Sequence, residues 1–178
     1  MRLIGVLGAA MVFAASPAYA ASGDCLWDSL APQTREALLT AYRANPDSAF
    51  GRVRPTPEDQ QAMTRNCGMT PANMLETLAV LKMTTLEKGA EAALRNERGV
   101  EASTLAGAWS GLAEADRAAL LAAANAAIEG DEDTGGADRA IGRFMTAAGL
   151  PLTTSGVNQG LYWLRAHSMR LAYEGRTG

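Results

Sequence analysis

The chain has 178 residues, which is enough for one domain or two small ones. Its 16 Lys and Arg residues stand against 19 Asp and Glu residues, so the formal net charge is −3 at pH 7. Because the two signs are mixed along the chain, there is no dense positive surface of the kind that neutralises nucleic-acid phosphates. Composition and charge therefore argue against a nucleic-acid-binding protein.

Residues 1–20 have the three parts of a secretory signal peptide. Arg2 provides a positive start, residues 3–15 form an apolar run, and the Ala-Tyr-Ala of residues 18–20 has the small-x-small pattern of a cleavage site. The apolar run is shorter than the roughly 20 residues that a membrane helix needs. We expect cleavage after Ala20, giving a periplasmic or secreted bacterial protein with no membrane span.

Cys25 and Cys67 are the two cysteines of the chain, and both follow the expected leader. In an oxidising compartment an even number of cysteines is typical of disulfides, and no C-x-x-C spacing suggests a reactive thiol pair. We therefore predict a Cys25–Cys67 disulfide, whose loop-closure entropy would contribute about 4 kcal/mol.

In the first half of the chain, helix patterns alternate with short polar connections. A turn of helix is expected at residues 25–30, and a full helix begins at Pro32, a favoured first helical position. The Thr-Pro-Glu-Asp run of residues 56–59 can cap the next helix and oppose its positive end, and Gly68 ends that helix. Apolar residues at helical spacing then predict a long amphipathic helix that starts near residues 70–71 and ends before residue 99.

After a link at residues 100–104, the second half follows the same order. Helices are expected over residues 112–128, over 137–148 and over about 156–174, with glycines ending the first two. No segment alternates with a period of two, so the sequence predicts an all-α protein without strands.

The stretch that begins at Trp27 returns 82 residues later, without a gap, as the stretch that begins at Trp109. Of the eighteen positions from Trp27 to Ala44, nine are identical in the second stretch. Similarity at a fixed shift is typical of duplicated units that stack on one another. We predict one compact domain of two tandem three-helix units, residues 25–98 with the disulfide and residues 107–178.

Two residue types recur at equivalent places in this repeat. Arg35 and Arg117 are interpreted as a structural salt bridge or a carbonyl cap that holds the first helix to the long one, because a duplicated unit repeats the residues that serve its own fold. The functional alternative is a contact with an anion or an acidic partner. Trp27 and Trp109 are expected in the core rather than as ligand platforms.

Residues that could perform chemistry are few. His167 is the single histidine, and no Cys, His and carboxylate cluster stands at ligand spacing, so we predict no metal site and no cofactor. Ser168 lies about 100° round the helix from its neighbour His167, which is a poor geometry for a Ser–His pair. We therefore assign no catalytic residue.

An acidic loop in the second half suggests a calcium site. Asp131, Asp133 and Asp138 could offer carboxylates to a hard cation. However, the closing Glu of an EF-hand loop is replaced by Gly142, so a solvated acidic loop is the favoured interpretation and calcium binding stays open.

The leading hypothesis is an exported binding protein without catalytic activity, which recognises a protein or small molecule in the cell envelope. The predicted ligand site is a groove between the two long helices, near Tyr162, Trp163, His167 and Arg170. The alternative is a small envelope-acting hydrolase or lyase that uses Glu91 or Glu174 with His167. Two carboxylates with raised pKa in one groove would favour the enzyme.

Overall fold

The structure is a computed structural model, and it describes residues 21–52, 54–131, 136–150 and 154–176. The predicted signal peptide, residues 1–20, lies outside the described residues. Within them the chain forms helices and no strand, which confirms the all-α prediction. The helices are α1 (Gly23–Ser29), α2 (Pro32–Ala44), the short 3-10 turn η1 (Pro46–Ser48), α3 (Ala49–Arg52), α4 (Pro57–Cys67), α5 (Met74–Arg98), α6 (Ala102–Ser110), α7 (Glu114–Glu129), α8 (Asp138–Ala147) and α9 (Thr154–Arg176).

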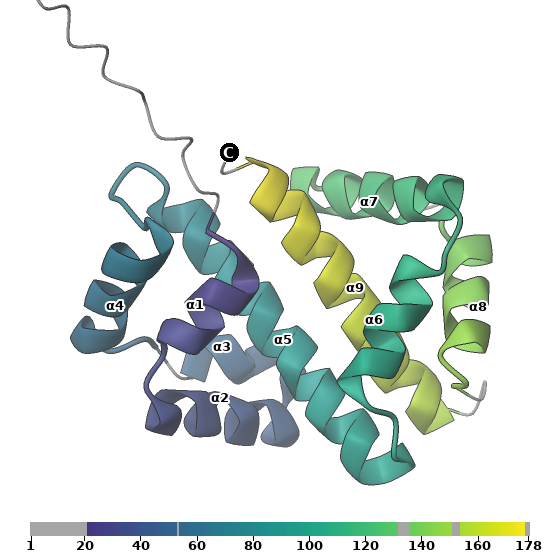
Figure 1. Cartoon of the computed structure of the whole chain (residues 1–178), viewed down its shortest axis with the longest axis horizontal. Coiled ribbons are helices and arrows are strands. Elements are labelled where there is room, and N and C mark those ends of the chain that lie inside the picture. The colour runs from purple at the N-terminus through teal and green to yellow at the C-terminus, as the bar shows by residue number, and fades with distance from the viewer. Residues whose placement is uncertain (1–20, 53, 132–135, 151–153, 177–178) are drawn as a thin grey trace, which may run out of the picture.

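The two long helices, α5 and α9, pack against each other through the centre of the molecule (Figure 1). They run antiparallel, since Glu87 of α5 lies beside Arg170 of α9 while Glu91, one turn further on, lies beside Trp163. Helices α1 to α4 lie on the α5 side of this pair, and α6 to α8 lie on the α9 side.

Local sequence explains where several helices begin and end. Thr56 and Asp59 form a capping box at the start of α4, and Gly68 ends this helix with φ of 70°, as the sequence predicts. The start of α5 differs from the prediction. Thr70 and Asn73 exchange the same two hydrogen bonds as Thr56 and Asp59, but residues 71–73 form a turn and the helix begins at Met74. The Asn73 amide also donates to the Gly68 oxygen over 3.2 Å, which ties this turn to the end of α4.

Two short helical segments were not predicted. Residues 46–52, to which no helix was assigned, form η1 and α3, and α6 at residues 102–110 begins within the predicted link of residues 100–104. Among the described residues, the predicted unit 25–98 therefore contains η1 and α3 in addition to its expected helices, and α6 overlaps the start of the predicted unit 107–178. Short helical turns of this kind escape periodicity arguments because they are not long enough to show a repeating apolar face.

Buried apolar side chains form two groups. One lies among α1, α2, α4 and α5 and includes Leu26, Leu38 and Met63. The other joins both halves of the chain, because Tyr42 of α2 belongs to the same cluster as Trp163 of α9. The two halves thus share part of one core, in agreement with a single compact helical domain.

The predicted disulfide between Cys25 and Cys67 is present, with the two Cα atoms 5.8 Å apart. It joins α1 to the last residue of α4, and the Ser29 hydroxyl lies 3.2 Å from the Cys67 sulfur. This bond fixes α4 to the beginning of the described chain. None of the described helices combines the length and the apolar character that crossing a membrane requires.

Candidate functional site

The four residues predicted to bind a ligand all lie on α9, but three of them are used in packing against other helices. Trp163 and His167 are 1% and 8% exposed, and the Arg170 side chain is 11% exposed. Tyr162 is half-buried, and its hydroxyl lies 3.4 Å from a carboxylate oxygen of Asp47. A cavity with a largely apolar wall lies elsewhere on α9, against α7 and α8.

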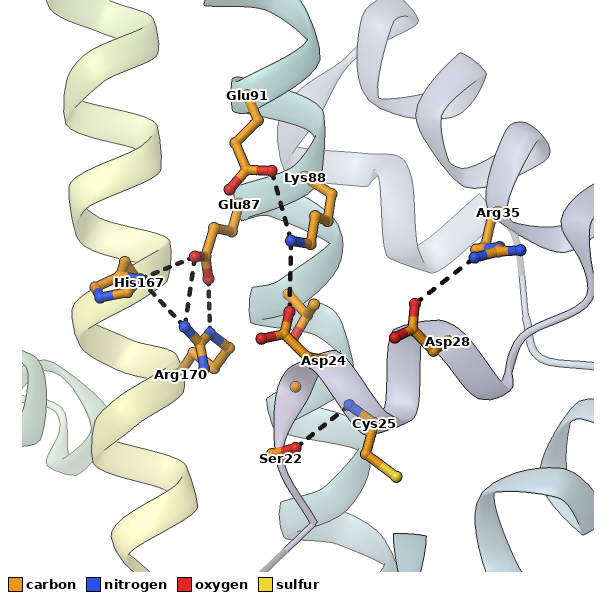
Figure 2. A network of polar contacts seen from close by, with 12 residues as sticks. Ser22, Asp24, Cys25, Asp28, Arg35, Glu87, Lys88, Glu91, His167 and Arg170 are labelled. Carbon is orange, nitrogen blue, oxygen red and sulfur yellow. Dashed lines mark hydrogen bonds and ion pairs between the residues drawn. The ribbon is translucent and has the colours of Figure 1, made fainter. Parts of the chain in front are cut away.

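A polar cluster lies at the contact between α5 and α9 (Figure 2). Glu87 of α5 is 5% exposed, and its carboxylate lies 2.8 Å from Nδ1 of His167. Arg170 donates from Nε to the second Glu87 oxygen over 2.6 Å, and from Nη1 to Glu174 over 2.8 Å. Because Glu174 also accepts from the backbone N–H of Gly23, the cluster links α1, α5 and α9.

The charges of this cluster stabilise one another. Burial alone would raise the pKa of Glu87, but the hydrogen bonds and positive charge of His167 and Arg170 outweigh burial and hold this pKa below its usual range. Burial alone would likewise lower the pKa of Arg170, but the hydrogen bond and charge of Glu87 raise it. A carboxylate held in its ionised form is poorly suited to proton transfer near neutral pH, so the cluster has the properties of a structural ion pair.

The surroundings of His167 were only partly foreseen. The sequence proposed Glu91 or Glu174 as its carboxylate partner, whereas the structure places Glu87 there. Glu91 accepts from the Trp163 indole N–H at 3.2 Å, and Glu174 accepts from Arg170. Two carboxylates with raised pKa in one groove would have favoured the enzyme hypothesis, whereas the carboxylate beside His167 has a lowered pKa.

The His167 ring is enclosed by two tryptophans. It stacks on Trp163 with ring centroids 4.5 Å apart, and the Trp109 ring meets it edge-on at 4.7 Å. A carboxylate only accepts hydrogen bonds, so we assign the Nδ1 hydrogen to the bond with Glu87. The other ring nitrogen, Nε2, is buried and makes no hydrogen bond with the described residues.

A cavity of about 570 Å³ lies between α7, α8 and α9. Its volume falls within the roughly 300–1,000 Å³ that is typical of small-molecule sites. Most of its wall is apolar and much of it is alanine: Leu120, Ala123, Ala124, Ala127, Ala137, Ile141, Leu161, Leu164 and Met169. The polar side chains in the lining are Asp131, Arg165 and Ser168.

Helix α7 creates this hollow because it presents small side chains to α9. Ala123, Ala124 and Ala127 fall on one face at helical spacing, and all three line the cavity. On the opposite wall, Arg165 is exposed, and its guanidinium makes no hydrogen bond or ion pair with any residue that the structure describes. The site therefore combines an apolar interior with an unpaired positive group.

The acidic loop gives only partial information about calcium. Asp131 lines the cavity, Asp138 is the first residue of α8, and Asp133 lies outside the described residues. Over the parts of the chain that are described, no three His, Cys, Asp or Glu side chains gather as ligands of a metal ion would.

The recurring arginines have structural contacts. Arg35 lies 3.8 Å from Asp28, while Arg117 donates 2.8 Å hydrogen bonds to the backbone oxygens of Ser110 and Leu112. The contacts are of the two types that the sequence favoured, but neither holds the first helix of its unit to the long one. Arg35 joins α2 to α1, and Arg117 joins α7 to the last residue of α6 and to the connection after it.

Comparison of the chain with models of known protein families, with curated proteins and with solved structures finds no match. The fold and the site therefore have to be interpreted from their own chemistry. They define an all-α, disulfide-linked protein with an apolar cavity whose lining carries a basic group.

Proposed function

We propose that the protein is an exported binding protein, without catalytic chemistry of its own, which holds a small apolar molecule between α7, α8 and α9. The observation that carries the proposal is the cavity of about 570 Å³ with its largely aliphatic wall. Each square ångström of apolar ligand surface removed from water there would contribute about 25 cal/mol. A mostly apolar site with a few polar groups is the usual form of a small-molecule pocket.

The polar groups of the cavity favour binding over catalysis. Ser168 is buried, and its hydroxyl donates a 2.8 Å hydrogen bond to the backbone oxygen of Leu164. This hydrogen bond uses the proton that a base would have to remove before the hydroxyl could attack a substrate. His167 lies on the neighbouring position of α9, with its Nδ1 directed to Glu87 on the other long helix.

We also propose that the two halves arose by internal duplication. Helices α2 and α7 begin at Pro32 and Glu114, 82 residues apart, and each follows an alanine in the N-cap position. Arg35 and Arg117 each reach the residue seven positions earlier. In the long helices, Thr85 and Ser168 each donate to the backbone oxygen four residues before them. The first two pairs are aligned by the shift of 82 residues, and the long helices are aligned by the same shift with one extra residue, which pairs Thr85 with Ser168. These contacts support the duplication because they occur at aligned positions.

The duplication would explain why the cavity lies in the second half. Ala124 is aligned with Tyr42, which is 1% exposed and packs so closely on α5 that a Cβ at Gly89 would overlap its ring. An alanine at the aligned position leaves the corresponding space between α7 and α9 less filled. The proposed ligand would occupy the volume that an aromatic ring takes in the first half.

The test is the binding of Nile red, a neutral dye whose fluorescence rises in an apolar site, to the protein purified with its disulfide intact. We expect saturable binding to the wild type and at least tenfold weaker binding to Ala124→Tyr, which copies the first half into the cavity. Ala122→Leu adds apolar volume at an exposed position of the same helix and should bind as the wild type does.

Circular dichroism would establish that each variant is folded, and Ala127→Leu replaces Ala124→Tyr if the larger side chain prevents folding. Absence of saturable dye binding to the wild type would overturn the proposal. So would unchanged binding by a folded cavity-filling variant.

A further inference from the structure

We infer that the ligand is an amphiphile with a single negative group, of the kind represented by a medium-chain carboxylic acid. Its apolar chain would lie among the aliphatic side chains of α7, α8 and α9, and its carboxylate would pair with Arg165. This inference rests on the proposed function, since it names the chemistry of the molecule that the cavity holds.

Arg165 differs from the other two arginines of α9 in having no protein partner among the described residues, and it differs from Arg139 of α8, which also makes no hydrogen bond or ion pair with a described residue, in lining the cavity. Arg170, Arg176 and Arg143 each form an ion pair with a carboxylate of the protein, and Arg117 caps backbone oxygens. The Arg165 guanidinium has no such partner among the described residues, although it lines the cavity. A guanidinium offers two parallel N–H groups that match the two oxygens of a carboxylate, so the unpaired residue suits an anionic ligand.

The position of Arg165 places its positive charge next to the apolar wall of the cavity. Leu161 and Met169 stand four residues before and after Arg165, and all three line the cavity. Residues four apart are neighbours on one helix face. A ligand that filled the cavity would therefore bring its apolar body and an acid group against adjacent turns of α9. This is the arrangement that a fatty-acid-like molecule requires.

The second ionisable residue of the lining restricts the charge of the ligand. Asp131 is already engaged in an interaction within the protein, so it is not free to serve a ligand cation. Its negative charge nevertheless opposes a second negative charge in the same small space. The site thus favours a monoanion, such as a carboxylate, over a dianion such as a phosphate monoester.

The experiment compares two probes of equal chain length, dodecanoate and dodecan-1-ol, by displacement of Nile red at low ionic strength and below the micelle concentration. For the wild type we expect dodecanoate to bind about fivefold tighter than dodecan-1-ol, the range of an exposed ion pair. Arg165→Met should remove this preference by weakening dodecanoate alone. Lys82→Met removes an exposed positive charge of α5 that lies outside the cavity lining, and this variant should keep the preference.

The outcomes separate this inference from the proposed function. Equal binding of acid and alcohol by the wild type, or a preference that survives Arg165→Met, would overturn the inference while the proposed function stands. If Nile red binds but neither probe displaces it, the inference fails while the proposed function stands; if the dye does not bind saturably, both fail. Dodecyl phosphate at a pH where it is a dianion should bind more weakly than dodecanoate, and tighter binding would contradict the assigned effect of Asp131.

Discussion

Replacing Glu87 by Gln would remove the negative centre of the buried cluster between α5 and α9. Glu87 accepts from His167 and Arg170, and the side chains of all three are about nine-tenths buried or more. Removing one partner of a buried ion pair costs about 3–5 kcal/mol, because the remaining charge is left in a medium that solvates it poorly. Arg170 keeps its bond to Glu174, so we expect the lower end of this range, about 3 kcal/mol.

For a protein of this size, a loss of about 3 kcal/mol corresponds to a fall in Tm of about 6–12 °C. Urea unfolding followed by circular dichroism measures the change in the free energy of unfolding at constant m-value. The matched control is Glu129→Gln, because Glu129 pairs with Arg176 over 2.9 Å but its side chain is 68% exposed. The exposed pair should cost less than about 1 kcal/mol. Equal losses for the two variants would refute the argument from burial.

A double variant separates the ion pair from simple loss of packing. Replacing Glu87 by Gln and Arg170 by Met together should cost less than the sum of the two single changes, because each single change already breaks the Glu87–Arg170 pair and leaves one buried charge of that pair without its partner. Strict additivity would show that the two side chains do not depend on each other.

Three further predictions follow from the described residues. Folding lowers the pKa of Glu87 and of Asp59, so the unfolded chain binds protons before the folded chain does as the pH falls. The stability that these two carboxylates contribute should be full above about pH 5 and should decline below about pH 4. A urea midpoint that does not change from pH 6 to pH 3 would contradict this prediction. Reduction of the Cys25–Cys67 disulfide should lower the free energy of unfolding by about 4 kcal/mol, measured as the shift in urea midpoint with reductant, and a change under about 1 kcal/mol would refute its stabilising role. Mass spectrometry of protein recovered from a bacterial periplasm should show a chain that begins at Ala21, and an intact leader would disprove the predicted cleavage.

Sequence patterns predicted those features that depend on neighbouring residues. The Thr-Pro start of α4, its glycine stop and the end of α5 before Gly99 follow from caps and helical spacing, and the structure has all three. The disulfide followed from the number of cysteines and the expected compartment. The start of α5 was placed too early: Thr70 and Asn73 make the expected capping hydrogen bonds, but the Asn73 amide also binds the Gly68 oxygen, and residues 71–73 form a turn before the helix.

The site was less predictable, because it depends on which side chains meet across helices. Glu87 lies among the buried residues of α5, three positions after Thr84, and a lone carboxylate on a buried stripe was a sign that it needs a partner. Identifying His167 as that partner required the antiparallel register of α5 and α9. The cavity could not be predicted from the sequence either. Its volume depends on alanines of α7, and alanines on a helix face usually indicate close packing of two helices.

The most direct test of the account is a methyl NMR titration of the oxidised protein with dodecanoate. The account predicts saturable shifts of the methyl groups of Leu120, Ile141 and Leu164, which line the cavity, and unchanged methyl groups of Leu26 and Leu38, which lie in the core under α1 and α2. Shifts confined to the first half of the chain, or no saturable shifts at all, would contradict it.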